Sequence, residues 1–175
     1  MKKTKRIVYI LIFALGFTYI AGMSIPTSPS VVFYRENTSD VLAYFPLQGN
    51  QTFTHTYTHS IHLSDVKETY EVIGENEFAL RELVYEDTSI GMPSNAEEGE
   101  TFSFENGKYR IQGMNRVFSE ISMRLGIESP TNRISIGDQE VLLQDTLEPG
   151  SWVTMKVSKL TGWQRLKGVN LDDPS

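Results

Sequence analysis

The alternation of apolar and polar residues at every second position constrains the fold of this 175-residue chain more than any other feature. Within residues 52–61, Phe53, His55 and Tyr57 fall on one side of an extended strand, and threonines fall on the other. Similar runs recur at residues 31–35, 41–47, 67–73, 78–85, 102–105, 108–111, 134–136, 139–143 and 151–158. Such strands bury one face of an antiparallel sheet. We therefore expect an all-β domain over residues 31–160, either an antiparallel sandwich or a barrel-like fold.

Short turn sequences separate these predicted strands. Asn106-Gly107 supplies the positive φ angles of a type I′ turn, so residues 102–111 should form a hairpin. Gly137-Asp138 joins a second pair of strands, and residues 74–76 join a third. Residues 117–125 fit a helix or a strand, and the pattern leaves both open.

The N-terminal segment has a different character, because residues 7–25 contain no charged side chain. A helix of that length reaches about 28 Å, close to the hydrocarbon thickness of a bilayer. The cations before it (Lys2, Lys3, Lys5 and Arg6) should stay in the cytoplasm by the positive-inside rule. We expect a basic cytoplasmic segment at 1–6, a transmembrane signal anchor at 7–25, a linker at 26–30 and a polar tail at 161–175.

A cleaved signal peptide is the alternative interpretation of the same segment. Gly22-Met23-Ser24 offers the small residues that a signal peptidase requires. Both interpretations place the β domain on the extracytoplasmic side. The protein is a single-pass protein of the cell membrane if the segment is kept, and a secreted protein if it is cleaved.

Charge and cysteine content exclude several classes of function. Four of the 16 Lys and Arg residues precede the apolar segment, which leaves 12 cations against 22 anions in the rest of the chain. Such an acidic domain repels phosphate groups, so we expect neither nucleic acid nor an anionic lipid surface as its partner. The chain has no cysteine, which excludes disulfides, thiolate metal sites and a cysteine nucleophile.

The three histidines, His55, His59 and His62, are close together in the sequence. In a strand, His55 and His59 would lie roughly 13 Å apart, too far to share one metal ion. His59 and His62 would point to opposite faces. Glu68 and Glu82 are further possible ligands, but no spacing brings them to the histidines. We therefore predict no metal, no cofactor and a structural or hydrogen-bonding role for the histidines.

Signals of catalysis are sparse. Ser60 and His59 are neighbours in a predicted strand and so face opposite ways, and no G-x-S-x-G motif occurs. The acidic residues 97–100 lack the alternating Asp and Asn ligands of a calcium loop and fit a solvated connection. We predict no catalytic residue.

The sequence Tyr57-Thr58-His59-Ser60-Ile61, followed by Val66, Glu68 and Tyr70, resembles the signature of a bacterial family, domain of unknown function 1850. Members read roughly Y-T-H-S-V, a short turn and T-P-V-x-E-x-Y. The resemblance continues through Leu83 and Tyr85 to Gly91-Met92-Pro93-Ser94, which is similar to the family's G-A-G-L-P-S segment, and on to the Asn106-Gly107 hairpin. This chain lacks the proline before Val66 and has Ser89-Ile90-Gly91 in place of G-A-G, so no role is carried over from those positions.

The resemblance implies a small extracytoplasmic protein found beside the membrane subunits of TRAP transporters of the TAXI type, which carry organic acids. It implies a functional surface made of Tyr57, His59, Ser60, Glu68, Tyr70 and Pro93. The turn after His59 would make His59 and Glu68 cross-strand neighbours within hydrogen-bond reach. That pair would either belong to the contact surface or lock the hairpin.

Together, these observations favour a membrane-anchored, non-catalytic accessory or interaction module, with transporter subunits as its partners. The alternative is an extracytoplasmic domain that binds or senses a small ligand, with Tyr57, Tyr70, Tyr85 and Tyr109 lining the pocket. A hydrolase is the third class considered.

Overall fold

The structure is a computed structural model that describes residues 2–61, 63–88, 91–128 and 131–173. The smaller of two sheets has the order β12-β2-β1-β11-β8 and consists of β1 (Pro26–Arg35), β2 (Val41–Pro46), β8 (Ile121–Arg124), β11 (Trp152–Thr161) and β12 (Val169–Asn170). The larger sheet has the order β10-β9-β3-β4-β5-β7-β6 and consists of β3 (Thr52–Thr58), β4 (Asp65–Val72), β5 (Phe78–Tyr85), β6 (Thr101–Glu105), β7 (Lys108–Phe118), β9 (Asn132–Ile136) and β10 (Gln139–Leu142). The helices are α1 (Lys2–Met23), α2 (Gly162–Lys167) and the short 3-10 helix η1 (Leu143–Asp145).

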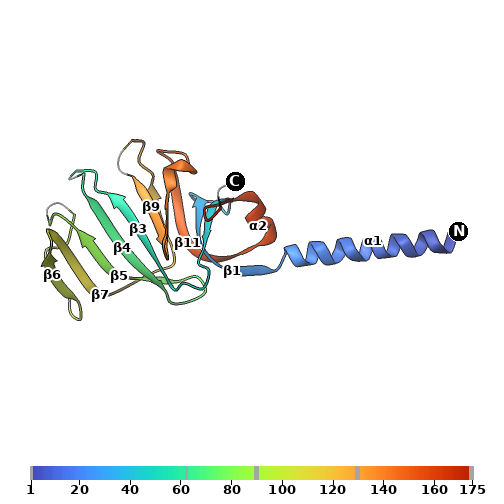
Figure 1. Cartoon of the computed structure of the whole chain (residues 1–175), viewed down its shortest axis with the longest axis horizontal. Helices are drawn as coiled ribbons and strands as arrows, with labels where there is room; N and C mark the ends of the chain where they lie inside the picture. The colour runs from blue at the N-terminus through green and yellow to red at the C-terminus, as the bar shows by residue number, and fades with distance from the viewer. Residues whose placement is uncertain (1, 62, 89–90, 129–130, 174–175) are drawn as a thin grey trace.

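The two sheets share one apolar core, so the domain is a mostly antiparallel β-sandwich (Figure 1). Phe33 of β1, Phe45 of β2 and Met155 of β11 are fully buried side chains of the smaller sheet. Phe53 of β3 and Phe78 of β5 belong to the same core and come from the larger sheet. The pairing of β12 with β2 is parallel, whereas the other described pairings are antiparallel.

The predicted all-β fold is confirmed, and the strand predictions differ from the structure chiefly at the strand ends. Residues 78–85 form β5 with the predicted bounds. Asn106 and Gly107 have φ angles of 53° and 77° and join β6 to β7, as a type I′ hairpin requires. The open choice over residues 117–125 is a strand, because β7 continues to Phe118 and β8 follows.

The prediction of a linker at residues 26–30 is wrong. Strand β1 begins at Pro26, which lies opposite Thr161 of β11, and Ser30 is completely buried. Sequence-local signals such as Pro26 and Pro29 suggested an extended linker, but an extended segment also pairs readily as a strand. Long-range pairing with β11 therefore extends the domain to its N-terminal boundary with α1.

The prediction of a polar tail at residues 161–175 is also wrong for its described part. The Arg165 guanidinium of α2 lies over the Tyr44 ring, 5.1 Å from its centroid. Strand β12 then pairs with β2, and Leu171 is 2% exposed and donates its backbone N–H to the Tyr44 carbonyl at 2.9 Å. Helix α2 therefore packs on the outer face of the smaller sheet, β12 extends that sheet at the edge beside β2, and Leu171 joins the core.

Helix α1 extends away from the two sheets (Figure 1). Among the residues that the structure describes, no helix has both the length and the apolar character needed to cross a membrane. The predicted spanning helix is thus not confirmed.

The larger sheet continues beyond the smaller one at β7 and β6, which lie at the end of the molecule opposite α1 (Figure 1). The core-facing side of the sheet therefore becomes accessible to solvent along these strands. The exposed fraction of the side chains rises accordingly from β7 to β6: Ile111 of β7 is completely buried, whereas Phe104 of β6 is 59% exposed.

Candidate functional site

The β3–β4 hairpin carries most of the residues that the family resemblance indicates. In this hairpin His55 lies opposite Glu68. Strand β3 pairs with β9 along its other edge, where Tyr57 lies opposite Asn132. Alternation brings Tyr70 to the same core-facing side, where it is 2% exposed. We refer to His55, Tyr57, Glu68, Tyr70 and Asn132 as the polar cluster.

Hydrogen bonds connect the polar cluster. The Nε2 atom of His55 lies 3.0 Å from Oδ1 of Asn132, and the Tyr70 hydroxyl donates to Oε2 of Glu68 at 2.7 Å. The Nδ1 atom of His55 lies 3.6 Å from the same Glu68 oxygen. The backbone N–H of Asn132 donates to Gln144 Oε1 at 3.0 Å, which fixes the strand that carries the amide.

The geometry of His55 defines where its protons lie. The Oδ1 atom of Asn132 is an acceptor, so Nε2 of His55 carries a proton and donates it to this oxygen. The Nδ1 atom then faces the Glu68 carboxylate at 3.6 Å, beyond hydrogen-bond distance, and has no hydrogen-bond partner among the described residues.

Two tyrosines of the polar cluster are held as neutral phenols. Burial raises the pKa of Tyr70 well above its ordinary value of 10.0, and the charge of Glu68 and the hydrogen bond to it raise this pKa further. Burial also raises the pKa of Tyr57, with the Glu68 charge as the second cause. A neutral phenol donates hydrogen bonds and is neither a base nor a nucleophile.

The polar cluster is suited to holding strands in register. Its one carboxylate, Glu68, has a side chain that is only 20% exposed, and His55 is 5% exposed. Buried polar groups that bond to one another favour one arrangement of the strands that carry them. The polar cluster therefore fits the structural role, in which it holds β3, β4 and β9 in register, better than a role as a contact surface.

The predicted pairing of His59 with Glu68 is wrong. The backbone N–H of His59 donates to the Ser64 carbonyl at 2.8 Å, and the His59 carbonyl accepts from the N–H of Leu63 at 2.9 Å. The chain therefore reverses closer to His59 than the predicted pair requires, and Glu68 falls opposite His55. Ser60 lies exposed in this turn.

The predicted surface residues fall in three parts of the fold. Tyr57, Glu68 and Tyr70 belong to the polar cluster, whereas His59 and Ser60 belong to the turn between β3 and β4. Pro93 lies in the connection from β5 to β6, where its carbonyl accepts a hydrogen bond from the Tyr85 hydroxyl.

A group of aromatic rings lies on β5, β7 and β6. The sequence suggested two of its members, Tyr85 and Tyr109, only as lining residues of a ligand pocket, and gave no role to the phenylalanines. Tyr85 pairs with Tyr109, and Tyr109 pairs with Phe104. The centroid of the Tyr109 ring is 5.6 Å from that of Tyr85, 5.7 Å from that of Phe102 and 4.6 Å from that of Phe104. We refer to these four residues as the aromatic face. The available sequence signal was the alternation of aromatic residues on both sides of Asn106-Gly107.

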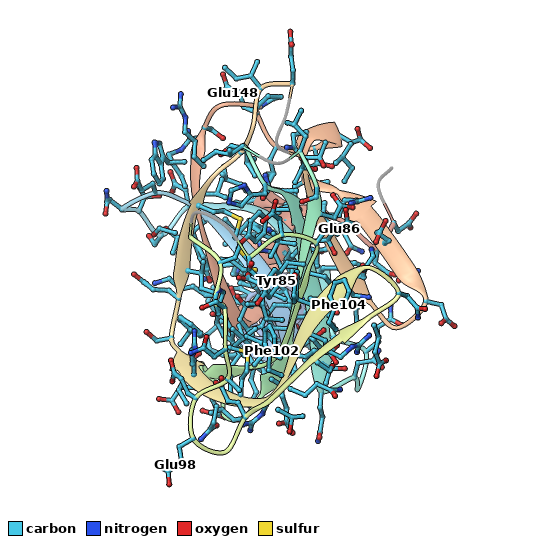
Figure 2. The ribbon with its side chains drawn as sticks, turned by 90° about the vertical axis from the view of Figure 1, so that its left-hand side faces the viewer. Tyr85, Glu86, Glu98, Phe102, Phe104 and Glu148 are labelled. Carbon is cyan, nitrogen blue, oxygen red and sulfur yellow. The ribbon has the colours of Figure 1, made fainter. Side chains whose placement is uncertain are left out.

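The aromatic face lies at the end of the molecule shown in Figure 2, where Tyr85, Phe102 and Phe104 project close together near the middle of the view. Exposure increases outward along the face, from 1% at Tyr85 to 59% at Phe104. Glu86 lies near the rings in the same view and pairs with Lys108 at 3.2 Å, and Glu98 projects farther out at the lower end (Figure 2). An apolar centre with a polar rim is the usual anatomy of a protein–protein interface.

No metal site is apparent within the described ranges, since no group of three or more His, Cys, Asp or Glu side chains there could hold an ion. His55 belongs to the polar cluster, and His59 accepts the N–H of Ile61 at its Nδ1 atom, 3.3 Å away. His62, the third member of the predicted histidine cluster, lies outside the described residues.

A polar hollow of about 540 Å³ lies on the smaller sheet. Its lining comes from the β1–β2 turn and from the segment around β8 and β11, with Asn37, Thr38, Ser39, Asp40, Glu120, Ser122, Thr154 and Lys156. The Lys156 ammonium pairs with Glu120 at 2.5 Å. Hydroxyl, carboxylate and ammonium groups therefore all face this hollow.

Comparison with protein-family models identifies the family of the chain. The model of the family described as Domain of unknown function (DUF1850) matches residues 53–143, which run from β3 to the start of η1. No curated protein and no solved structure matches the chain. The matched residues include the whole polar cluster and the whole aromatic face. Because the match covers more than half of its residues, the chain belongs to the DUF1850 family.

Proposed function

We propose that this domain is a non-catalytic interaction module on the extracytoplasmic side of a membrane, and that it binds a partner protein through the aromatic face. The observation that carries the proposal is the 59% exposure of Phe104, at the end of a row of rings that begins in the core. Exposed apolar groups rimmed by polar residues mark interaction sites. Aromatic side chains supply much of the binding energy in such sites.

The polar cluster supports this function indirectly. It holds β3, β4 and β9 in one register. Strand β5 pairs with β4, and β7 pairs with β5. The aromatic face is therefore positioned before a partner arrives. A rigid, preformed surface loses less conformational entropy on binding than a flexible one.

Attachment to a membrane is a separate part of the proposal. Apolar side chains of α1 are widely exposed, with Ile10 at 59%, Phe13 at 77% and Phe17 at 65%. Exposure on this scale favours contact with lipid or with another protein. The length and hydropathy of the described helix do not support a span, so attachment needs its own test.

That test is alkaline carbonate extraction of membranes that contain the full chain, combined with protease digestion from each side. The proposal predicts that the chain stays in the membrane pellet and that the β domain is digested only from the extracytoplasmic side. Release by carbonate, or digestion from the cytoplasmic side, contradicts membrane attachment in this orientation.

The proposed partners are membrane subunits of a TRAP transporter of the TAXI type, as the family resemblance implies. The part of the chain after the apolar segment has 12 cations against 22 anions. Complementary charge accelerates association and excludes wrong partners. The contacted loop of the partner should accordingly be basic and carry an apolar side chain that packs on Phe104.

Co-purification of the tagged full chain from its native membranes tests the partner. Phe104→Ser removes the exposed ring, and Trp152→Ser is the matched control, because Trp152 is 49% exposed on the smaller sheet. We expect the native chain and Trp152→Ser to recover the same membrane protein, and Phe104→Ser to recover much less of it. A native chain that purifies alone, or equal recovery by all three, contradicts the proposal.

The polar hollow favours a second candidate, the binding of a small polar solute. Concave sites with a few converging polar groups are the usual form of ligand sites. Within this hollow the Ser122 hydroxyl lies 3.3 Å from the Thr154 hydroxyl, beside the Lys156–Glu120 pair. The four tyrosines that the sequence suggested do not line it. A thermal shift on adding sugars or amino acids, lost in Thr154→Val, would favour this candidate over the interaction module.

A further inference from the structure

Strand β6 is an edge strand that lacks the proline, lysine or bulge that often protects an edge. In the described part of the chain it pairs with β7 alone, and this pairing has no bulge. Its sequence, Thr-Phe-Ser-Phe-Glu, contains neither proline nor lysine. Natural proteins place such residues, or a bulge, on edge strands to prevent pairing with other chains.

The other three sheet edges are better protected. Strands β8 and β10 have 4 residues each, and β12 has 2. A charged side chain lies on β8 (Arg124) and on β10 (Glu140), as Glu105 does on β6, so length separates these edges. Strand β6 has 5 residues and alternates two aromatic side chains with small or polar ones. It is therefore the edge best suited to accept another strand.

The hairpin geometry shows which backbone groups of β6 are unpaired. Asn106 and Gly107 form a two-residue turn, so Glu105 and Lys108 on either side of it are a hydrogen-bonded pair. Hydrogen-bonded and non-hydrogen-bonded pairs alternate along an antiparallel ladder. The N–H and C=O groups of Phe102 and Phe104 therefore point away from β7, toward the open edge.

We propose that two copies of this chain associate through the open edges of their β6 strands, antiparallel and centred on Ser103. In that register Phe102 of each copy lies opposite Phe104 of the other. Each of these pairs exchanges both of its backbone hydrogen bonds, which uses all the outward groups of the two phenylalanines. A two-fold axis requires such a self-complementary surface.

The side chains agree with the same register. Phe102 and Phe104 share the core-facing side of β6, so the two copies place aromatic rings opposite each other there, a favourable cross-strand pair. On the other side, Glu105 lies opposite Thr101 of the second copy, so no like charges are directly opposed. Ser103 meets its own counterpart, and its small side chain allows close approach.

This association goes beyond the proposed function and does not depend on it. Pairing through β6 joins the two larger sheets into one, and the two aromatic faces then lie side by side across the two-fold axis. A partner would meet a surface twice as wide. The domains themselves are acidic and repel each other, so added salt should strengthen the association, whereas it would weaken binding to a basic strand of another protein.

Cysteine crosslinking of the full chain tests the proposal directly, because the native chain has no cysteine. Two Ser103 residues form a non-hydrogen-bonded pair with Cα atoms about 4.5 Å apart, which suits a disulfide. We expect Ser103→Cys to form a covalent dimer on mild oxidation. The control is Glu140→Cys, on the edge strand β10 of the same sheet, which should remain largely monomeric. Absence of the Ser103→Cys dimer, or equal crosslinking of both variants, overturns the proposal.

A dilution series by analytical ultracentrifugation provides the second measurement. The native chain should show a dimer whose dissociation constant falls as salt is added. Phe104→Lys places a charge on the edge and should raise the dissociation constant by about tenfold or more, with an unchanged circular dichroism spectrum. A native chain that stays monomeric at every salt concentration, or a Phe104→Lys variant that dimerises as tightly, contradicts the self-association. These outcomes leave the co-purification result untouched, so the two proposals can fail independently.

Discussion

His55 lies directly opposite Glu68 in the pairing of β3 with β4, and its Nδ1 atom is 3.6 Å from Oε2 of that carboxylate. The same oxygen accepts the hydroxyl of Tyr70 at 2.7 Å. A carboxylate on the core-facing side of a sheet is costly unless its oxygens are hydrogen-bonded. The Tyr70 hydroxyl therefore stabilises Glu68 at this position, and the two residues should depend on each other.

Replacement of Tyr70 by phenylalanine should reveal this dependence. Tyr70→Phe removes the donor to Glu68 and leaves a mostly buried carboxylate oxygen short of a partner, so the free energy of unfolding should fall by about 1–3 kcal/mol. Urea denaturation measures the change. In a double-mutant cycle, Glu68→Ala should remove most of the effect of Tyr70→Phe. Additive effects of the two changes would show that the hydrogen bond contributes nothing.

The raised pKa values of Tyr57 and Tyr70 predict how stability depends on pH. In the unfolded chain both phenols ionise near their ordinary pKa of 10.0, whereas in the fold burial, followed by the Glu68 charge, keeps them protonated at higher pH. Their contribution is therefore complete below pH 10.0 and is lost as the pH rises above it. Thermal unfolding measured from neutral to strongly alkaline pH should show a decline that begins there. The Tyr57→Phe, Tyr70→Phe double variant should decline less steeply, and an unchanged decline would contradict the assignment.

The docking of the C-terminal segment predicts a large effect of a small substitution. A Cβ atom at Gly168 would lie 2.6 Å from Cγ1 of Val41, so Gly168→Ala should destabilise the domain by about 1–3 kcal/mol. The matched control is Gly74→Ala, where the nearest atoms are 3.6 Å away and the change should be close to neutral. Chemical denaturation of both variants distinguishes the cases. Equal stability of the two variants would mean that residues after α2 do not pack on β2.

The strands were predictable because their signals are local. Alternation in residues 52–58 and the Asn106-Gly107 turn fix elements within a few residues of themselves, and both are found in the structure. The boundaries at 26–30 and 161–175 were missed because β1 and β12 exist through pairing with distant strands, β11 and β2. Two residues of parallel pairing, as in β12, leave no periodicity in the sequence.

Most residues of the polar cluster were predicted from the sequence, but the pairing between them was not. Alternation correctly placed His55 and Tyr57 on the same side of β3, and the resemblance indicated Glu68 and Tyr70. The register was wrong because residue spacing does not show where a turn reverses, and a shift of four residues, like any even shift, keeps every side chain on the same face. His55 therefore takes the position opposite Glu68 that His59 was expected to occupy. Asn132 could not be found, since β9 is far from β3 in sequence.

Site-specific photocrosslinking at position 104 tests the central claim, that the aromatic face is the contact surface of an interaction module. A photoreactive phenylalanine analogue replaces Phe104 in one full chain and Trp152 in another, and both are irradiated in native membranes. The two positions are similarly exposed, at 59% and 49%, but lie on different sheets. We expect position 104 to give a discrete crosslinked product with a protein other than a second copy of this chain, and position 152 to give none. No such product from position 104, or the same products from both positions, would contradict the claim.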